Sequence, residues 1–113
     1  MTDRELLELA AKAAGIEGEW VGDSLLDYYY KLPTAGYLTV SEGRNHVWNP
    51  LTSSGDALRL AVKLGVDIYV DDGKSEVWVT EVNHPIEHFD NDPYAATRRA
   101  IVRAAASIGK EMK

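Results

Sequence analysis

The segment Ser54–Leu64 constrains the fold of this chain more than any other, because its helical pattern is apolar around most of its circumference. The polar positions of the pattern fall on one narrow strip, formed by Asp56, Arg59 and Lys63. A helix of this kind has to be buried on more than one side. We therefore expect it in the middle of a small core, with Leu58 and Val62, opposite the strip, among the buried residues.

Residues that favour helix ends mark three helices in the chain. A residue able to cap a helix precedes each of them, and a glycine follows each. The expected caps are Thr2, which forms a capping box with Glu5, then Ser53 or Ser54, and finally Asp92, which precedes Pro93. The expected terminal glycines are Gly15, Gly65 and Gly109, so that the last helix is predicted to end near Ile108.

Short antiparallel strands are expected between the helices, over residues 36–40, 44–48, 66–70 and 75–80. The last two flank Asp72 and Gly73, a strong hairpin signal because glycine tolerates a positive φ. Residues 16–35, which include the tyrosine run at 28–30, show no clean period. The predicted fold class is α+β, a small antiparallel sheet layered with three helices in the order α-β-β-α-β-β-α.

Composition excludes several classes of function. The 113 residues suit a single domain, and the net charge of −6 argues against a direct nucleic-acid-binding surface. An acidic chain can nevertheless act as a DNA mimic, and that alternative stays open. The chain has no cysteine and no run of about 18 apolar residues, so we expect neither thiolate zinc sites nor a membrane span. With an acidic, helix-like start, a cytoplasmic location is predicted.

In the third helix, Arg98 lies in the middle of a predicted apolar face. That face also contains Tyr94, Ile101, Ala105 and Ile108. An arginine there has to be paired, line a cavity or extend its guanidinium to the surface. Two interpretations stay open: an ion pair with an acid such as Asp67 or Glu81, or an anion-binding side chain. The other basic residues of this helix, Arg99, Arg103 and Lys110, are expected on a solvated strip.

Trp48 and Asn49 stand at the entrance to the helix that begins near Ser54. The indole offers a flat face for stacking, and the asparagine amide both donates and accepts hydrogen bonds. The first amides of the helix favour an anion. A small, anionic, nucleotide-like ligand would suit this arrangement, and the candidate ligand-binding residues are Trp48, Asn49, Arg59 and Arg98. The alternative is that Trp48 is a core residue and Asn49 only forms a turn with Pro50.

Histidine and acidic residues gather in the segment 82–91 and at its end, which Pro85 predicts to be a loop. The members are His84, Glu87, His88, Asp90 and Asp92. Such side chains bind zinc and related ions, so a small metal-dependent hydrolase that uses the loop from His84 to Asp92 is an alternative function. Because Pro85 disfavours a helical His-x-x-x-His face, we instead expect a polar loop leading to the Asp92 cap and no metal site.

No motif selects a catalytic centre. The phosphate-binding Gly-x-x-x-x-Gly-Lys and the Gly-x-Ser-x-Gly elbow are both absent from the sequence. The Asp71-Asp72-Gly73 stretch lacks the further ligands of a calcium loop. We expect no catalytic residues and no cofactor, and hence a protein that is not an enzyme.

The order of these elements resembles the phage ABA sandwich domain family of small phage and prophage proteins. The resemblance rests on Trp48 and the helix that follows, on the hairpin with Trp78, and on the Asp-Pro-Tyr-Ala-Ala-Thr-Arg-Arg-Ala-Ile-Val-Arg-Ala-Ala-Ala helix at residues 92–106. The Glu-Leu-Leu-Glu-Leu-Ala run of the first helix is similar to the family's usual start. The resemblance covers about four-fifths of the chain and implies a layered α/β fold, but it brings no catalytic residues.

The leading hypothesis is a non-catalytic accessory binding protein of phage or prophage type, with counter-defence as one possible role. It would occupy a host protein or sequester a small anionic ligand, and it would form a homo-oligomer. The phage origin and the binding role are what the resemblance and the chain length imply.

Overall fold

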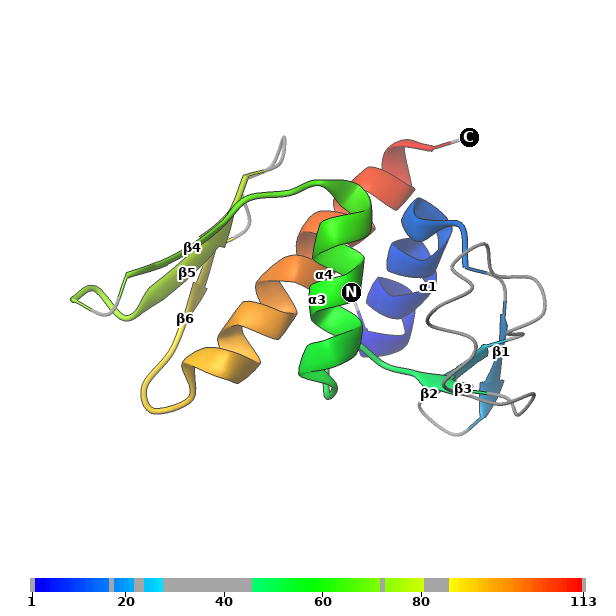
Figure 1. Ribbon diagram of the computed structural model, residues 1–113, viewed down its shortest axis with the longest axis horizontal. Coiled ribbons are helices and arrows are strands. Elements are labelled where there is room, and N and C mark those ends of the chain that lie inside the picture. The colour runs from blue at the N-terminus through cyan, green and yellow to red at the C-terminus, as the bar shows by residue number, and fades with distance from the viewer. Residues whose placement is uncertain are drawn as a thin grey trace.

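The computed structural model of the chain describes residues 2–16, 18–21, 24–27, 46–71, 73–80 and 86–112. In order, the described elements are α1 (Asp3–Ala14), β1 (Gly18–Val21), β2 (Ser24–Asp27), β3 (His46–Trp48), α3 (Ser54–Leu64), β4 (Ile68–Asp71), β5 (Glu76–Val79), β6 (Ile86–His88) and α4 (Pro93–Glu111). Figure 1 shows these helices in the centre of the molecule, with a sheet at either end.

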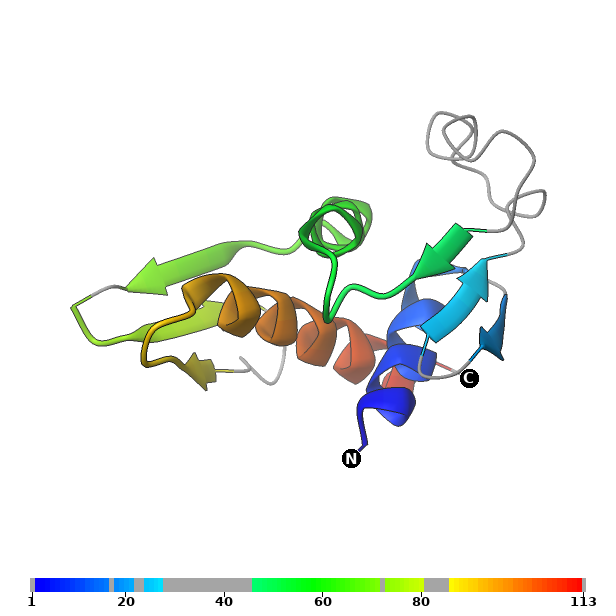
Figure 2. The ribbon, with the colours of Figure 1, turned by 90° about the horizontal axis from the view of Figure 1, so that it is seen from below.

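The described part of the chain has the predicted α+β class and the three predicted helices. Its strands form two separate antiparallel sheets, β1-β2-β3 and β4-β5-β6, whereas the sequence predicted a single small sheet. The view in Figure 2 separates the two sheets clearly. The predicted loop over residues 82–91 was wrong for Ile86–His88, because pairing with β5 makes a strand there despite the weak local pattern. The predicted strand at 36–40 and the tyrosine run at 28–30 lie outside the described residues.

The predicted helix caps are confirmed. Thr2 and Glu5 form the capping box of α1, Ser53 caps α3, and Asp92 caps α4 with Pro93 in its first turn. Gly15 and Gly65 end α1 and α3 in the left-handed conformation that glycine adopts most readily. In the β4–β5 hairpin, however, the positive φ among the described residues falls on Ser75 (53°) and not on Gly73.

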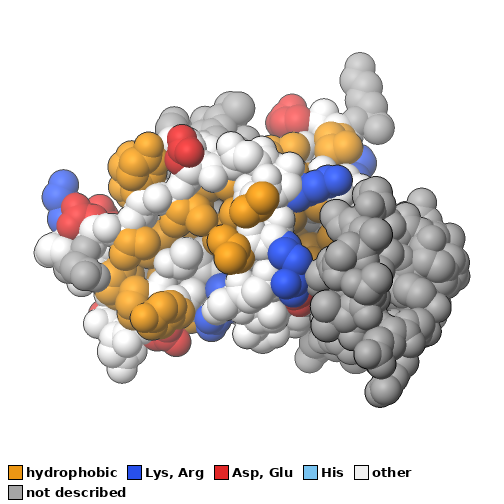
Figure 3. Space-filling view, in the orientation of Figure 1, with side chains coloured by type: hydrophobic (Ala, Val, Ile, Leu, Met, Phe, Trp, Pro, Cys, Tyr) orange, Lys and Arg blue, Asp and Glu red, His pale blue; other side chains and the backbone are white. Residues whose placement is uncertain are grey.

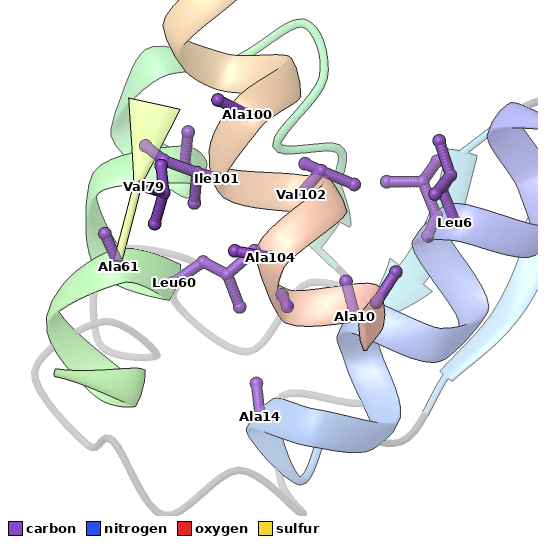
Figure 4. Packing of buried hydrophobic residues seen from close by; sticks show 14 of the residues in the cluster. Leu6, Ala10, Ala14, Leu60, Ala61, Val79, Ala100, Ile101, Val102 and Ala104 are labelled. Atoms are coloured by element: carbon purple, nitrogen blue, oxygen red, sulfur yellow. The ribbon is translucent and has the colours of Figure 1, made fainter. Parts of the chain in front are cut away.

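Helix α4 is the central element of the fold. It packs against α1 on one side and against α3 and β5 on the others. Small residues dominate its buried positions, so the neighbouring backbones approach closely, as Figure 4 shows around Ala100 and Ala104. The buried residues of α4 are Ala96, Ala100, Ile101, Val102, Ala104, Ala105, Ala106 and Gly109.

Two expectations for α4 were wrong. Tyr94 was predicted on the core face but is 73% exposed, because it lies in the first turn beyond the packed part of the helix. Gly109 was predicted to follow the helix, yet α4 continues through it to Glu111. A Cβ at Gly109 would lie 2.8 Å from the Leu9 carbonyl carbon and closer still to its oxygen. This glycine therefore allows α1 and α4 to cross in close contact.

Helix α3 has the predicted bounds, but its buried face differs from the predicted one. Leu58 and Val62 are 60% and 73% exposed, whereas Asp56, which was placed on the polar strip, is 2% exposed. The buried positions are Asp56, Ala57, Leu60 and Ala61, which share the face turned toward α4. Figure 3 shows apolar side chains at the surface over α3, in agreement with the exposure of Leu58 and Val62.

Candidate functional site

The candidate ligand-binding residues converge on the first turn of α3, and the buried carboxylate of Asp56 organises them. One Asp56 oxygen accepts a hydrogen bond from the Asn49 backbone N–H at 2.9 Å, and the other accepts from Arg59 Nη2 at 2.9 Å. A buried carboxylate needs such donors, because an unpaired charge is costly to remove from water. Asp56 thus joins the turn after β3 to the helix that follows.

Arg98 reaches this turn from α4. Its Nε donates to the Leu51 carbonyl oxygen at 3.0 Å, and its Nη1 donates to Ser54 Oγ at 3.0 Å. The expected pairing with Asp67 was wrong, and Glu81 lies outside the described residues. Within the described ranges, no carboxylate forms an ion pair with Arg98. The positive charge of Arg98 therefore lies beside the positive end of the α3 dipole.

Arg59 lies on the same turn of α3. Its guanidinium passes over Gly55, where an added Cβ would meet Arg59 Nη2 at 3.3 Å. The amides of Ser54 and Gly55 belong to the first turn and have no intrahelical acceptor. Since Arg59 is already paired with Asp56, the groups at this helix end that favour an anion are the Arg98 guanidinium and the two backbone amides.

Trp48 and Asn49 occupy structural positions beside this end of α3. Trp48 is 3% exposed and belongs to the core, so its ring is not presented for stacking. Asn49 Oδ1 accepts from the Leu51 N–H at 3.0 Å, and its carbonyl oxygen accepts from the amides of Thr52 and Ser53. Asn49 therefore shapes the turn in the way asparagine side chains commonly do. A ligand-binding role for Trp48, Asn49, Arg59 and Arg98 stays a prediction.

A second candidate surface, which the sequence reasoning missed, lies on the β4–β6 sheet. Register pairs Tyr69 with Trp78 and Trp78 with Ile86, so the three side chains form a row on one face. The rings of Tyr69 and Trp78 stack with centroids 4.1 Å apart and an interplanar angle of 16°. Val77 and Val79, fully buried, point to the opposite face, against α4. Side-chain alternation in a strand places Tyr69 on the same face as Asp67 and Asp71, and this pattern was the signal that could have revealed the row.

The loop residues proposed for a metal do not converge in the described part of the chain. Glu87 and His88 are neighbours on β6 and therefore point to opposite faces of the sheet. Glu87 pairs with Arg103 of α4, while His88 Nδ1 lies 3.7 Å from Glu76 Oε2. Asp92 is occupied as a helix cap, and His84 lies outside the described residues. Among the described residues, no group of three histidine or acidic side chains is placed to hold an ion.

Comparison with protein-family models, with curated protein sequences and with solved structures gave no match. The resemblance to the phage ABA sandwich domain family therefore stays a prediction. Within the described residues, no helix has the length and apolar character needed to cross a membrane.

Proposed function

We propose that this chain is a non-catalytic binding protein that acts by occupying another protein through the outward side of α3. The observation that supports the proposal is the exposure of Leu58 and Val62, one turn apart on a helix whose other side is packed. Neighbouring apolar side chains left in water favour association, since burying each of them contributes about 1.5–3 kcal/mol.

Further exposed groups surround this pair. Arg59 and Lys63 follow Leu58 and Val62 along α3 and frame them with positive charge. Arg98, through its contact with Ser54, links α4 to the start of α3. Apolar anchors within a polar rim are typical of protein interfaces.

The biological setting of the proposal comes from the family resemblance. In this proposal the chain is a phage or prophage accessory protein that acts in the host cytoplasm, and its role is counter-defence. The occupant of the α3 surface is then a host protein, and homo-oligomerisation through the same surface is the competing outcome.

The test compares three tagged proteins, purified from bacterial cells, by native mass spectrometry. We expect the parent to retain a partner chain and Leu58→Ser/Val62→Ser to lose it. Val70→Ser is the matched control, because Val70 is also apolar and 51% exposed but lies on β4. Equal retention by the parent and the double variant would contradict the proposal. A retained partner with the mass of this chain would show that the surface binds a second copy and not a host protein.

A small anionic ligand at the first turn of α3 is the second candidate function. It is supported by Arg98, whose charge has no described carboxylate partner and lies beside two helix amides. Calorimetric titration with inorganic phosphate and with a nucleoside monophosphate tests it. Arg98→Met should abolish binding, whereas Arg99→Met should not, because Arg99 pairs with Asp3 at the other side of α4. No heat with either anion would contradict this candidate.

A further inference from the structure

The outer face of the β4–β6 sheet is defined by Tyr69, Trp78 and Ile86 with the acids Asp71 and Glu76. Helix α4 packs on the other face of this sheet, and no described helix covers the outer face. Tyr69 and Ile86 remain 43% and 47% exposed, while Trp78 between them is half-buried. The row is therefore a flat apolar platform open to solvent.

Several carboxylates lie beside the platform. Asp71 and Glu76 are direct register partners, so two carboxylates face each other across β4 and β5. Asp67 continues the alternation on the other side of Tyr69 and is exposed. Like charges placed directly opposite each other destabilise a sheet, and a cation bound between them would relieve this repulsion.

Two local groups reduce the acidity of the face without neutralising it. Asp71 Oδ1 accepts a hydrogen bond from the Lys74 backbone N–H at 3.2 Å, within the turn. His88, the register partner of Glu76 on β6, places Nδ1 3.7 Å from Glu76 Oε2. Asp67, Asp71 and Glu76 thus place three carboxylates along this part of the sheet, against the single lysine of the turn, Lys74.

We propose that the outer face binds an arginine-rich peptide segment of a partner protein. A guanidinium group can lie on the ring of Tyr69, whose other side already stacks on Trp78, and can pair with a carboxylate of Asp71 or Glu76. The aliphatic stem of arginine covers the apolar row at the same time. A second copy of this chain is disfavoured as the occupant, because two outer faces in contact would oppose their carboxylates.

This inference goes beyond the proposed function, because it concerns a different surface and a different chemistry. Leu58 and Val62 lie on α3, on the far side of α4 from the outer face of the sheet. A variant that removes the α3 surface should therefore leave the outer face intact. The failure of one proposal is distinguishable from the failure of the other.

The experiment is an NMR titration of the labelled protein with an (Arg-Gly)4 peptide, with (Glu-Gly)4 as the control peptide. We expect the Trp78 indole signal, assigned through Trp78→Phe, to shift with the arginine peptide and not with the glutamate peptide. The indole signal of Trp48, which is buried in the core, should not move. Leu58→Ser/Val62→Ser should bind the arginine peptide as the parent does.

Charge variants make the test specific. Asp71→Asn/Glu76→Gln should weaken binding about tenfold, the loss expected for two exposed ion pairs. Glu8→Gln/Glu111→Gln, which changes the net charge equally at α1 and the end of α4, should bind within about twofold of the parent. Tyr69→Leu should weaken binding about three- to fivefold through loss of the ring.

Four results would each overturn the proposal. The first is equal weakening by the two charge pairs, and the second is a shift confined to residues outside β4–β6. The third is an equal response to both peptides. The fourth is a Trp78 shift with neutral cellohexaose and none with the arginine peptide, which would make the platform a carbohydrate surface.

Discussion

At the scale of single residues, two features shape the structure. One is the buried carboxylate of Asp56, and the other is the close approach of the α1 backbone to Gly109. Asp56 is almost fully buried although it is ionisable, and it is stabilised by the Asn49 amide and the Arg59 guanidinium. Gly109 is buried for a different reason, since the Leu9 backbone occupies the space where a side chain would begin. Both residues therefore have roles that depend on neighbours distant in the sequence.

Gly109→Ala should lower the free energy of unfolding by at least about 2 kcal/mol, because the added methyl group overlaps the α1 backbone and forces the helices apart. Gly55→Ala is the control, since its Cβ would meet only the flexible end of Arg59. Urea denaturation of both variants measures the difference. An unchanged midpoint for Gly109→Ala would show that α1 and α4 do not cross in close contact.

At the scale of elements, each helix is defined by a cap at its start and by one buried face. In α1 the backbone N–H and hydroxyl of Thr2 donate to the Glu5 carboxylate, and these hydrogen bonds hold the pKa of Glu5 below its ordinary value. In α3 the buried face contains Leu60 and excludes Leu58. The two sides of α3 should therefore respond differently to truncation.

Leu60→Ala should cost about 2–4 kcal/mol of unfolding free energy, the usual range for a buried leucine. Leu58→Ala should change it by less than about 0.5 kcal/mol, because the side chain is mostly in water already. Thermal melts of the matched pair measure both values. Equal losses would place Leu58 in the core, as the helical pattern of the sequence predicted.

Thr2→Ala should cost about 1 kcal/mol through loss of the α1 cap and should raise the pKa of Glu5 toward its ordinary value. Since the folded-state pKa is lowered, the contribution of the Glu5 carboxylate is fully present above its ordinary pKa. It is lost as the pH falls through the lowered folded value. NMR titration of the Glu5 carboxyl in both proteins measures the shift, and identical midpoints would contradict the contribution of the Thr2 hydroxyl, because the backbone N–H at position 2 still donates in the variant.

At the scale of the whole molecule, α4 holds the fold together. It contacts α1, α3 and the β4–β6 sheet, which have little contact with one another in the described part of the chain. The attachment of β6 is partly polar, because Arg103 pairs with Glu87 and donates to the Ile86 carbonyl oxygen at 3.1 Å. The sequence predicted Arg103 on a solvated strip. Its pairing with Glu87 depends on β6, a strand that the sequence did not predict.

Arg103→Met should lower the unfolding free energy by about 1–3 kcal/mol, since it leaves the mostly buried Glu87 carboxylate and the Ile86 carbonyl without their donor. Arg99→Met should cost less than about 1 kcal/mol, because its pair with Asp3 is well exposed. Hydrogen exchange of the β6 amides should accelerate only in Arg103→Met. Unchanged β6 exchange would show that apolar contacts alone hold this strand.

The sequence by itself determined the helices and their ends. Caps such as Thr2, Ser53 and Asp92 act within one turn of the residues they stabilise, so their effect is local and can be recognised without knowing the fold. The β4–β5 hairpin was recognisable for the same reason. Trp48 and Asn49 were also predicted at the entrance to the helix that begins at Ser54, although Trp48 is buried there and Asn49 shapes the turn.

Only the tertiary structure decided which helix faces are buried. In α3, apolar Leu58 faces solvent while ionisable Asp56 is buried, because α4 lies on the side of Asp56. The Asp56 carboxylate accepts hydrogen bonds there from the Asn49 backbone N–H and from Arg59. Gly109 and Arg103 follow the same rule, since the first meets the α1 backbone and the second meets β6. Burial depends on what packs from elsewhere in the chain, and a local pattern cannot contain that information.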